Sequence, residues 1–224
     1  MIDLILDDCM NVMKKYDDNH FDLAIVDPPY GGAVEKGGYK EESFNGHLSG
    51  GRSKKYKTHR TGGTWAEKYG TKIKQWDLAP TKEYFNELFR VSKNQIIWGG
   101  NYFDLPPNRC FLIWRKLTIS EKFTMAMCEY AWASFNKNAK WIEIAPQDKA
   151  RFHPTQKPIK LYEWILNNYA EKGQKILDTH LGSGSIAVAC HYFGVDLVGV
   201  EIDEEYYNKA KQRVNELTKQ TTMF

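Results

Sequence analysis

Four consecutive residues, Asp27-Pro28-Pro29-Tyr30, combine a carboxylate, a stiff backbone and an aromatic ring. An exocyclic amino group on a nucleobase is a poor nucleophile, because its lone pair is delocalised into the ring. The Asp27 carboxylate and the Pro28 carbonyl oxygen can accept its two hydrogens and draw the nitrogen towards tetrahedral geometry. Tyr30 offers a flat face on which an extruded base can stack, an interaction worth about 1–3 kcal/mol. Taken alone, the four residues also fit a strand-ending turn with a buried tyrosine.

A second group of residues, from Asp178 to Ser185, has the sequence DTHLGSGS and joins a predicted strand to a predicted helix. Gly182 and Gly184 allow a ligand to approach the backbone closely. Glu201 comes nineteen positions after Gly182, which is the spacing expected of a carboxylate that binds ribose hydroxyls. The pattern predicts a nucleoside-containing cofactor without saying which one. A dinucleotide loop and a plain strand-to-helix turn both stay open.

The third group, His153-Pro154-Thr155-Gln156-Lys157-Pro158, directly precedes a predicted helix. Thr155, Gln156 and the free main-chain N–H groups of a helix start can bind a carboxylate. A proline-rich helix start with Thr155 as its cap explains the same residues equally well. The spacing alone leaves both interpretations open.

The elements that position these groups alternate between strand and helix, which predicts an α/β fold with one Rossmann-like, doubly wound, mostly parallel sheet. At 224 residues, we expect a single domain over 1–224. The predicted strands are Leu4–Leu6, Asp22–Val26, Gln95–Trp98, Phe111–Trp114, Met125–Trp132, Lys175–Leu177 and Asp196–Val200. The predicted helices are Cys9–Lys15, Thr81–Val91, Pro158–Ala170, Ser185–Phe193 and Asp203–Leu217. The two prolines of the first group cannot continue a central strand, so they must lie in a turn at its carboxyl end.

Residues 31–75 interrupt this alternation and contain ten of the seventeen glycines. Between Lys36 and Lys74, ten basic and three acidic residues give a net charge of +7, against +3 for the whole chain. We expect a long, flexible, basic insert that contacts a polyanion, with a short helix near Trp65–Tyr69. A solvated loop without a ligand is the alternative. The candidate residues for this contact are Arg52, Lys54, Lys55, Lys57 and Arg60, and if the polyanion is DNA the two arginines can read guanine edges.

The composition excludes several classes of protein. Hydrophobic residues make up 42% and charged residues 26% of the chain, as in a soluble globular domain, and no apolar run is long enough to cross a bilayer. Acidic residues stand where a signal peptide would be basic, so we expect a cytoplasmic protein of a bacterial or phage-infected cell. The four cysteines are far apart and the six histidines show no H-E-x-x-H spacing. We therefore expect neither a disulfide framework nor a metal.

The three groups together resemble the β group of DNA amino-methyltransferases, in which the catalytic half precedes the cofactor half. The order is DPPY, then HPTQKP, then the glycine loop, then Glu201, and the resemblance covers nearly the whole chain apart from the insert. Gln95–Phe103 and Met127–Trp132 look like segments of phage and prophage members. The resemblance implies a methyltransferase fold with circularly permuted motif order and S-adenosyl-L-methionine as the cofactor. It also implies double-stranded DNA as the partner, and 153–217 as the cofactor-binding half. A homodimer and a restriction partner both stay open.

The resemblance also implies residue roles. The catalytic residues would be Asp27, Pro28, Pro29 and Tyr30. The residues around the cofactor would be Asp8 and Cys9 at its adenine, Glu201 at its ribose, and Thr155, Gln156, Lys157, Asp178, Gly182 and Gly184 at its methionine part. Asp27, His180 and Ser183 would also bind the cofactor. One departure is His180, which replaces an aromatic residue that commonly packs on the cofactor. An imidazole in this place can make binding pH-dependent.

The expected activity is that of a site-specific DNA methyltransferase. Asp27 at the head of the first motif favours N6 of adenine, because the cytosine-N4 enzymes more often begin with serine. Cytosine N4, RNA and another amine substrate stay open as alternatives. An NAD-dependent oxidoreductase would leave DPPY and the basic insert unexplained, and the intact motif opposes an inactive binding module. No cysteine follows the paired prolines, which disfavours cytosine-C5 chemistry.

Overall fold

The structure is a computed structural model that describes residues 1–30, 78–121, 126–146 and 151–219. The basic insert predicted at 31–75 lies outside these ranges. So do the short helix predicted near Trp65–Tyr69 and the five candidate DNA-binding residues.

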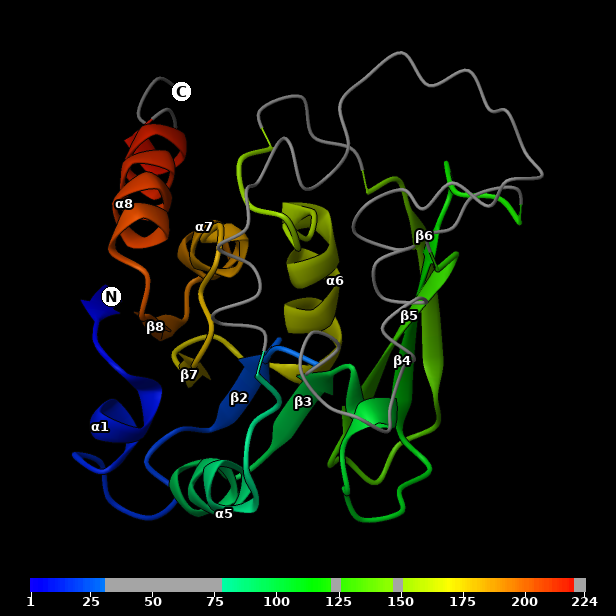
Figure 1. The fold of residues 1–224 in the computed structure, drawn as a ribbon, viewed down its shortest axis with the longest axis horizontal. Coiled ribbons are helices and arrows are strands. Elements are labelled where there is room, and N and C mark those ends of the chain that lie inside the picture. The colour runs from blue at the N-terminus through cyan, green and yellow to red at the C-terminus, as the bar shows by residue number, and fades with distance from the viewer. Residues whose placement is uncertain (31–77, 122–125, 147–150, 220–224) are drawn as a thin grey trace.

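An eight-stranded sheet forms the centre of the described chain, in the order β1-β8-β7-β2-β3-β5-β4-β6 (Figure 1). β5 is antiparallel to both of its neighbours, and every other adjacent pair is parallel. The predicted mostly parallel α/β sheet is therefore confirmed. The strands are β1 Ile2–Leu6, β2 Leu23–Val26, β3 Gln95–Trp98, β4 Phe111–Lys116, β5 Cys128–Ala133, β6 Lys140–Ile144, β7 Lys175–Asp178 and β8 Asp196–Glu201.

Burial explains which strands the sequence pattern revealed. β2 lies between β7 and β3 and is buried along its whole length, so it has the continuous apolar run of a central parallel strand. β6 was not predicted. It is an edge strand in which Lys140 and Trp141 are exposed, so it lacks an apolar run.

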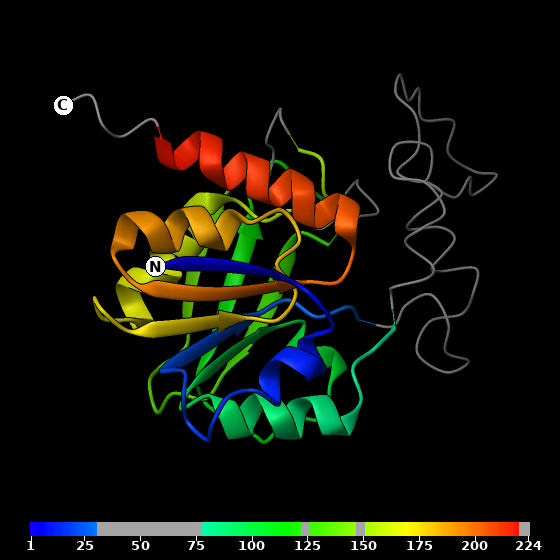
Figure 2. The same ribbon diagram turned by 90° about the vertical axis from the view of Figure 1, so that its left-hand side faces the viewer.

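Helices cover both faces of the sheet (Figure 2). α1 (Cys9–Met13) and α5 (Lys82–Val91) lie on one face. α6 (Ile159–Tyr169), α7 (Ser185–Phe193) and α8 (Glu204–Lys219) lie on the other. The five predicted helices are confirmed, with small differences at their ends. The predicted cap of the last helix is also confirmed, because Asp203 Oδ1 accepts hydrogen bonds from the main-chain N–H groups of Glu205 and Tyr206. No described helix is long and apolar enough to span a membrane.

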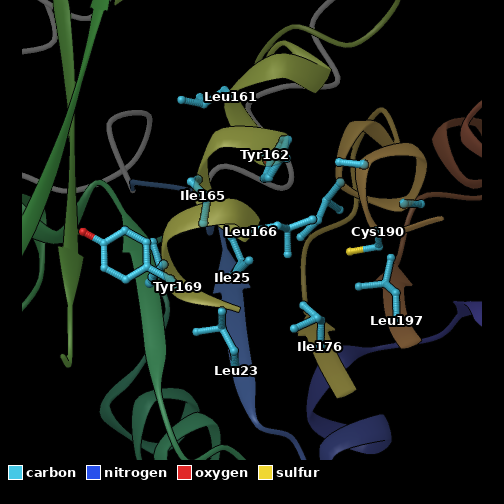
Figure 3. Packing of buried hydrophobic residues seen from close by; sticks show 14 of the residues in the cluster. Leu23, Ile25, Leu161, Tyr162, Ile165, Leu166, Tyr169, Ile176, Cys190 and Leu197 are labelled. Carbon is cyan, nitrogen blue, oxygen red and sulfur yellow. The ribbon is translucent and has the colours of Figure 1, made fainter. Parts of the chain in front are cut away.

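The apolar stripe predicted on α6 packs on the centre of the sheet (Figure 3). Its buried residues are Leu161, Tyr162, Ile165, Leu166 and Tyr169. They belong to one core cluster with Leu23 and Ile25 of β2, Ile176 of β7, Cys190 of α7 and Leu197 of β8. This packing fixes the start of α6 above the carboxyl end of β2.

The order of the strands creates a switch point between β2 and β7. The chain leaves β2 towards β3 through α5, and it leaves β7 towards β8 through α7, on the opposite face of the sheet. In open α/β sheets, ligands bind at the carboxyl ends of the strands at such a switch point. Asp27 directly follows β2 and Asp178 ends β7, so two carboxyl groups stand at this place.

Candidate active site

The Asp27 carboxylate is held by two contacts within the protein. Its Oδ1 accepts a hydrogen bond from the Tyr30 hydroxyl at 2.7 Å, and its Oδ2 forms an ion pair with Lys157 Nζ. The side chain is 13% exposed. Each carboxylate oxygen has more than one lone pair, so the group is oriented and can still accept hydrogen bonds from a substrate.

The Tyr30 ring packs between aromatic residues and a glycine. It stacks on Tyr102 with 4.9 Å between ring centroids, and its edge contacts Phe103. Gly99 has φ +68°, and a Cβ atom there would lie 2.2 Å from Tyr30 Cε1. Burial, and then the Asp27 charge, raise the pKa of Tyr30 well above 10, so its hydroxyl stays protonated and donates to Asp27. The ring predicted to receive a base is therefore one half of a stacked tyrosine pair.

Lys157 connects Asp27 to a second buried ion pair. Its Nζ lies 3.2 Å from Glu129 Oε2 and 5.1 Å from the centroid of the Trp98 ring. Glu129 Oε1 in turn lies 2.6 Å from Lys116 Nζ. Burial alone would lower the pKa of Lys157, but the carboxylates of Asp27 and Glu129 outweigh it and raise that pKa. Lys157 therefore stays a cation and cannot act as a general base near neutral pH.

Asp178 is a buried carboxyl group, 2% exposed, on the other side of the switch point. It accepts a hydrogen bond from the main-chain N–H of His180 at 3.0 Å. Burial, together with the charges of Asp27 and Glu201, raises the pKa of Asp178 to about 8. A cation such as an ammonium group that binds beside a buried carboxyl group favours its ionised form and is attracted to it.

Glu201 ties the end of β8 to the glycine loop. Its Oε2 accepts from Gly182 N–H at 2.8 Å, and its Oε1 accepts from the N–H groups of Ile202 and Asp203 at 3.0 Å. Burial raises the pKa of Glu201, although these hydrogen bonds act in the opposite direction. The carboxylate is thus fixed beside the loop, as a group that binds ribose hydroxyls would need to be.

The two glycines of the loop serve the protein's own packing. Gly182 and Gly184 have φ of +55° and +71°, which favours glycine. A Cβ on Gly182 would lie 3.2 Å from the His153 ring, and one on Gly184 would lie 3.0 Å from Val214. The sequence predicted close approach of a ligand as the reason for these glycines. The structure places protein side chains in the Cβ directions of these glycines, and the approach of a ligand to their backbone stays a prediction.

His180 is held by neighbouring side chains. Its Nδ1 hydrogen-bonds to Thr179 Oγ1 at 2.9 Å, and its ring lies edge-on to the ring of Tyr84, with 5.6 Å between the ring centroids. Tyr84 also hydrogen-bonds to Thr179. Burial lowers the pKa of His180 to about 4, so the imidazole is neutral at pH 7. The pH dependence expected from His180 is therefore wrong for the neutral range.

In the HPTQKP segment, His153 and Gln156 pack within the protein and Lys157 contacts the catalytic turn. The buried His153 ring packs on the glycine loop, and its Nδ1 accepts from the main-chain N–H of Thr155. Gln156 is buried, with its Oε1 accepting from Phe152 N–H. Thr155 is not the helix cap, because α6 begins at Ile159 with Pro158 at the N-cap position and no side-chain cap. Lys157 forms an ion pair with Asp27, and its predicted place in the methionine pocket stays a prediction.

Asp8 and Cys9 begin α1 just beyond the carboxyl end of β1. Asp8 Oδ1 caps the helix by accepting from Met10 N–H at 2.7 Å. Burial raises the pKa of Cys9 to about 12, so it is a neutral thiol. Because Leu6 of β1 pairs with Glu201 of β8, these two residues lie at the same edge of the sheet as the glycine loop.

Four residues of the site were not predicted from the sequence. Glu129 and Lys116 form the second ion pair, and Gly99 and Tyr102 hold the Tyr30 ring. A signal existed for Glu129, which places an acid in the otherwise apolar strand Cys128–Ala133. A signal also existed for Gly99, which directly follows a buried strand.

This fold and site define the class of amino-methyltransferases: an oriented Asp-Pro-Pro-Tyr turn stands across a switch point from a glycine loop closed by a carboxylate. Residues 52–212 match the N6/N4 methyltransferase family model, which is described as DNA methylase. The chain belongs to this family of DNA methylases.

Individual relatives agree with this assignment. The chain is 25% identical over 234 residues to the type II methyltransferase M.HpaI of Haemophilus parainfluenzae, which covers 95% of this chain and 74% of the relative. The fold is similar to that of the M1.HpyAVI–SAM complex, with TM-score 0.55, 19% identity, and coverage of 96% of this chain and 100% of that one. It is also similar to the cytosine-N4-specific PvuII DNA methyltransferase, with TM-score 0.58 and 10% identity, and the match covers 98% of this chain and 92% of that one. The protein is thus a DNA amino-methyltransferase.

Proposed function

We propose that the protein transfers a methyl group from S-adenosyl-L-methionine to N6 of adenine at a specific site in double-stranded DNA. The observation that carries this proposal is the position of Asp27. Its carboxylate is oriented by Tyr30 and Lys157 at the end of β2, across the switch point from Asp178. The aspartate at the head of the motif favours adenine, and cytosine N4 is the alternative that the test below distinguishes.

The chemistry of the donor set fits this cofactor. S-adenosyl-L-methionine supplies a methyl group on a sulfonium, and it carries an ammonium group and ribose hydroxyls. Asp178, whose pKa is raised by burial, would hold the ammonium group in its ionised form. Glu201 would accept from the ribose hydroxyls, and Thr155 and Gln156 lie on the segment that would bound the methionine end. We accordingly propose 153–217 as the cofactor-binding half and 31–75 as the segment that contacts DNA.

The reaction places simple demands on the catalytic turn. Asp27 and the Pro28 carbonyl oxygen would accept the two amino hydrogens and raise the electron density on the nitrogen. The nitrogen–methyl bond would form as the methyl–sulfur bond breaks and leaves a neutral thioether, and the proton lost from the nitrogen would pass through Asp27 to solvent. Lys157 is held as a cation, so its task is to orient Asp27 and not to remove a proton. Catalysis would come from positioning and from preorganised polar groups, without a covalent intermediate on the protein.

The test is to analyse DNA from cells that express the wild type or Asp27→Ala, by nucleoside mass spectrometry and methylation sequencing. We expect N6-methyladenine at one sequence with the wild type. Asp27→Ala should give at least about a 100-fold lower level, the scale of losing one preorganised polar group. Asp18→Ala is the matched control, since Asp18 is 74% exposed and pairs only with Arg90 among the described side chains.

Two outcomes would contradict this proposal. N4-methylcytosine in place of N6-methyladenine would assign the cytosine alternative. A wild-type protein that methylates RNA or another amine, and leaves DNA unmodified, would remove the DNA substrate altogether.

A further inference from the structure

We propose that Glu129 and Lys116 are positioning residues for methyl transfer, which hold the Lys157 ammonium in place and thereby fix the Asp27 carboxylate. Neither residue contacts Asp27 directly; Lys157 stands between them and it. The inference rests on the proposed function, because it gives these residues a task in the same reaction.

The contacts form one line across four elements. Asp27 follows β2, and Lys157 precedes α6. Glu129 is the second residue of β5, and Lys116 is the last residue of β4. Because β5 runs antiparallel to β4, its start lies beside the end of β4, at the edge of the sheet where β2 also ends. The antiparallel direction of β5 therefore brings these side chains into one line.

The charges in this line balance. Two carboxylates and two ammonium groups alternate from Asp27 to Lys116, and both lysines are buried, at 4% and 8% exposure. Glu129 is 24% exposed as a side chain, but its Oε2 atom is buried, accepts no hydrogen bond among the described residues, and forms an ion pair with Lys157 Nζ at 3.2 Å. An ammonium group shared between two carboxylates is fixed in position by both. Without Glu129, Lys157 would have Asp27 as its single described anionic partner, and would compete more strongly with a substrate amine for the Asp27 oxygens.

A purely stabilising task explains the line less well. Buried ion pairs contribute little net stability, because desolvation of the charges offsets their attraction. The neighbouring pair on β4 and β6, Arg115 with Glu143, is the opposite case. Its side chains are 59% and 31% exposed, and it has no link to Asp27 among the described contacts. Arg115 and Glu143 thus provide a matched control on adjacent strands.

The experiment measures the single-turnover rate of methyl transfer to DNA at saturating S-adenosyl-L-methionine, the Kd of the cofactor by calorimetry, and the melting temperature. For Glu129→Gln we expect a rate about 10- to 100-fold below wild type, the effect of a misplaced catalytic group, with the cofactor Kd within about twofold. Lys116→Met should behave in the same way, and Lys116→Arg, which keeps the charge, should restore most of the rate. Glu143→Gln should match the wild type.

Each other outcome has a definite meaning. A folded Glu129→Gln variant with the wild-type rate overturns the inference, and so does a fall in rate that is matched by an equal rise in cofactor Kd. If Glu129→Gln does not fold, Glu129→Asp keeps the charge but shortens the reach to Lys157, and an undiminished rate in that variant overturns the inference. An active wild type with unaffected variants removes this inference alone. A wild type that methylates no DNA removes the proposed function, and the inference falls with it.

Discussion

Both oxygens of Asp27 already have partners inside the protein, one a hydroxyl and one an ammonium group. These contacts restrict how the carboxylate can turn before any substrate arrives. A catalytic group that is oriented in advance loses little freedom in the transition state, which is why positioned polar groups contribute so much to rate. The stacked Tyr102 extends the same restriction to Tyr30.

Residue types predicted part of this site, and the rest depended on distant contacts. The aspartate of the DPPY motif and Glu201 could be found because their chemistry is tied to short local patterns. The partners of Lys157 could not, because Asp27 is 130 positions away along the chain and only the sheet brings the two together. The same reason hid the pairing of Lys116 with Glu129, although Glu129 is an acid in an otherwise apolar strand.

At the same scale, the raised pKa of Asp178 predicts how stability depends on pH. Because the folded-state pKa is about 8 and the ordinary value is 3.8, the folded protein binds more protons than the unfolded chain between these pH values. Protonation of Asp178 therefore favours the folded state, an effect that is fully present below about pH 4 and is lost as pH rises towards 8. Asp178→Asn cannot titrate, so its advantage in unfolding free energy over wild type should grow with pH, by at most about 1.4 kcal/mol per pH unit.

Urea unfolding of the two proteins at pH 5 and pH 8, without cofactor, measures this difference. A difference in unfolding free energy that is the same at both pH values would show that Asp178 is ionised throughout.

Among the elements, the helices were predicted best. The buried residues of α5 and α6 recur at helical spacing. Gly184 and Asp203 mark the starts of α7 and α8. β6 escaped because an edge strand does not need apolar residues on both faces. The reversed direction of β5 also has no local signal, since pairing direction depends on the path of the chain and not on residue type.

The turn after β3 offers a test at the scale of the element. Gly99→Ala should destabilise the protein by about 1–3 kcal/mol through its positive φ, and should also displace the Tyr30 ring, 2.2 Å from the new methyl group. Gly173→Ala is the matched control, because Gly173 has φ +83° and nothing within 4 Å of an added Cβ. We expect both variants to lose stability in urea unfolding, and only Gly99→Ala to lose methyl-transfer rate as well. Equal rates in the two variants would show that the Tyr30 position does not matter.

For the whole molecule, the basic segment makes a prediction about DNA affinity. Replacing Lys54, Lys55, Lys57 and Arg60 by alanine should weaken DNA binding at every sequence. It should also reduce the slope of log Kd against log salt, by about 0.9 for each DNA phosphate that the variant no longer neutralises. Fluorescence anisotropy over a range of salt concentrations measures both quantities. Affinity and slope equal to those of the wild type would remove the segment from the interface.

The pairing of β1 with β8 has a consequence for how the chain acquires its fold. Met1 and Asp196 form an ion pair although they are 195 positions apart, and β1 hydrogen-bonds to no other described strand. During synthesis, β1 leaves the ribosome well before β8, and among the described strands it has no partner until β8 follows. Contacts of such long range slow folding. The end of the sheet that carries Glu201 should therefore assemble late in biosynthesis. Until then, β1 and β8 should be the strands of the nascent protein that most need protection from aggregation.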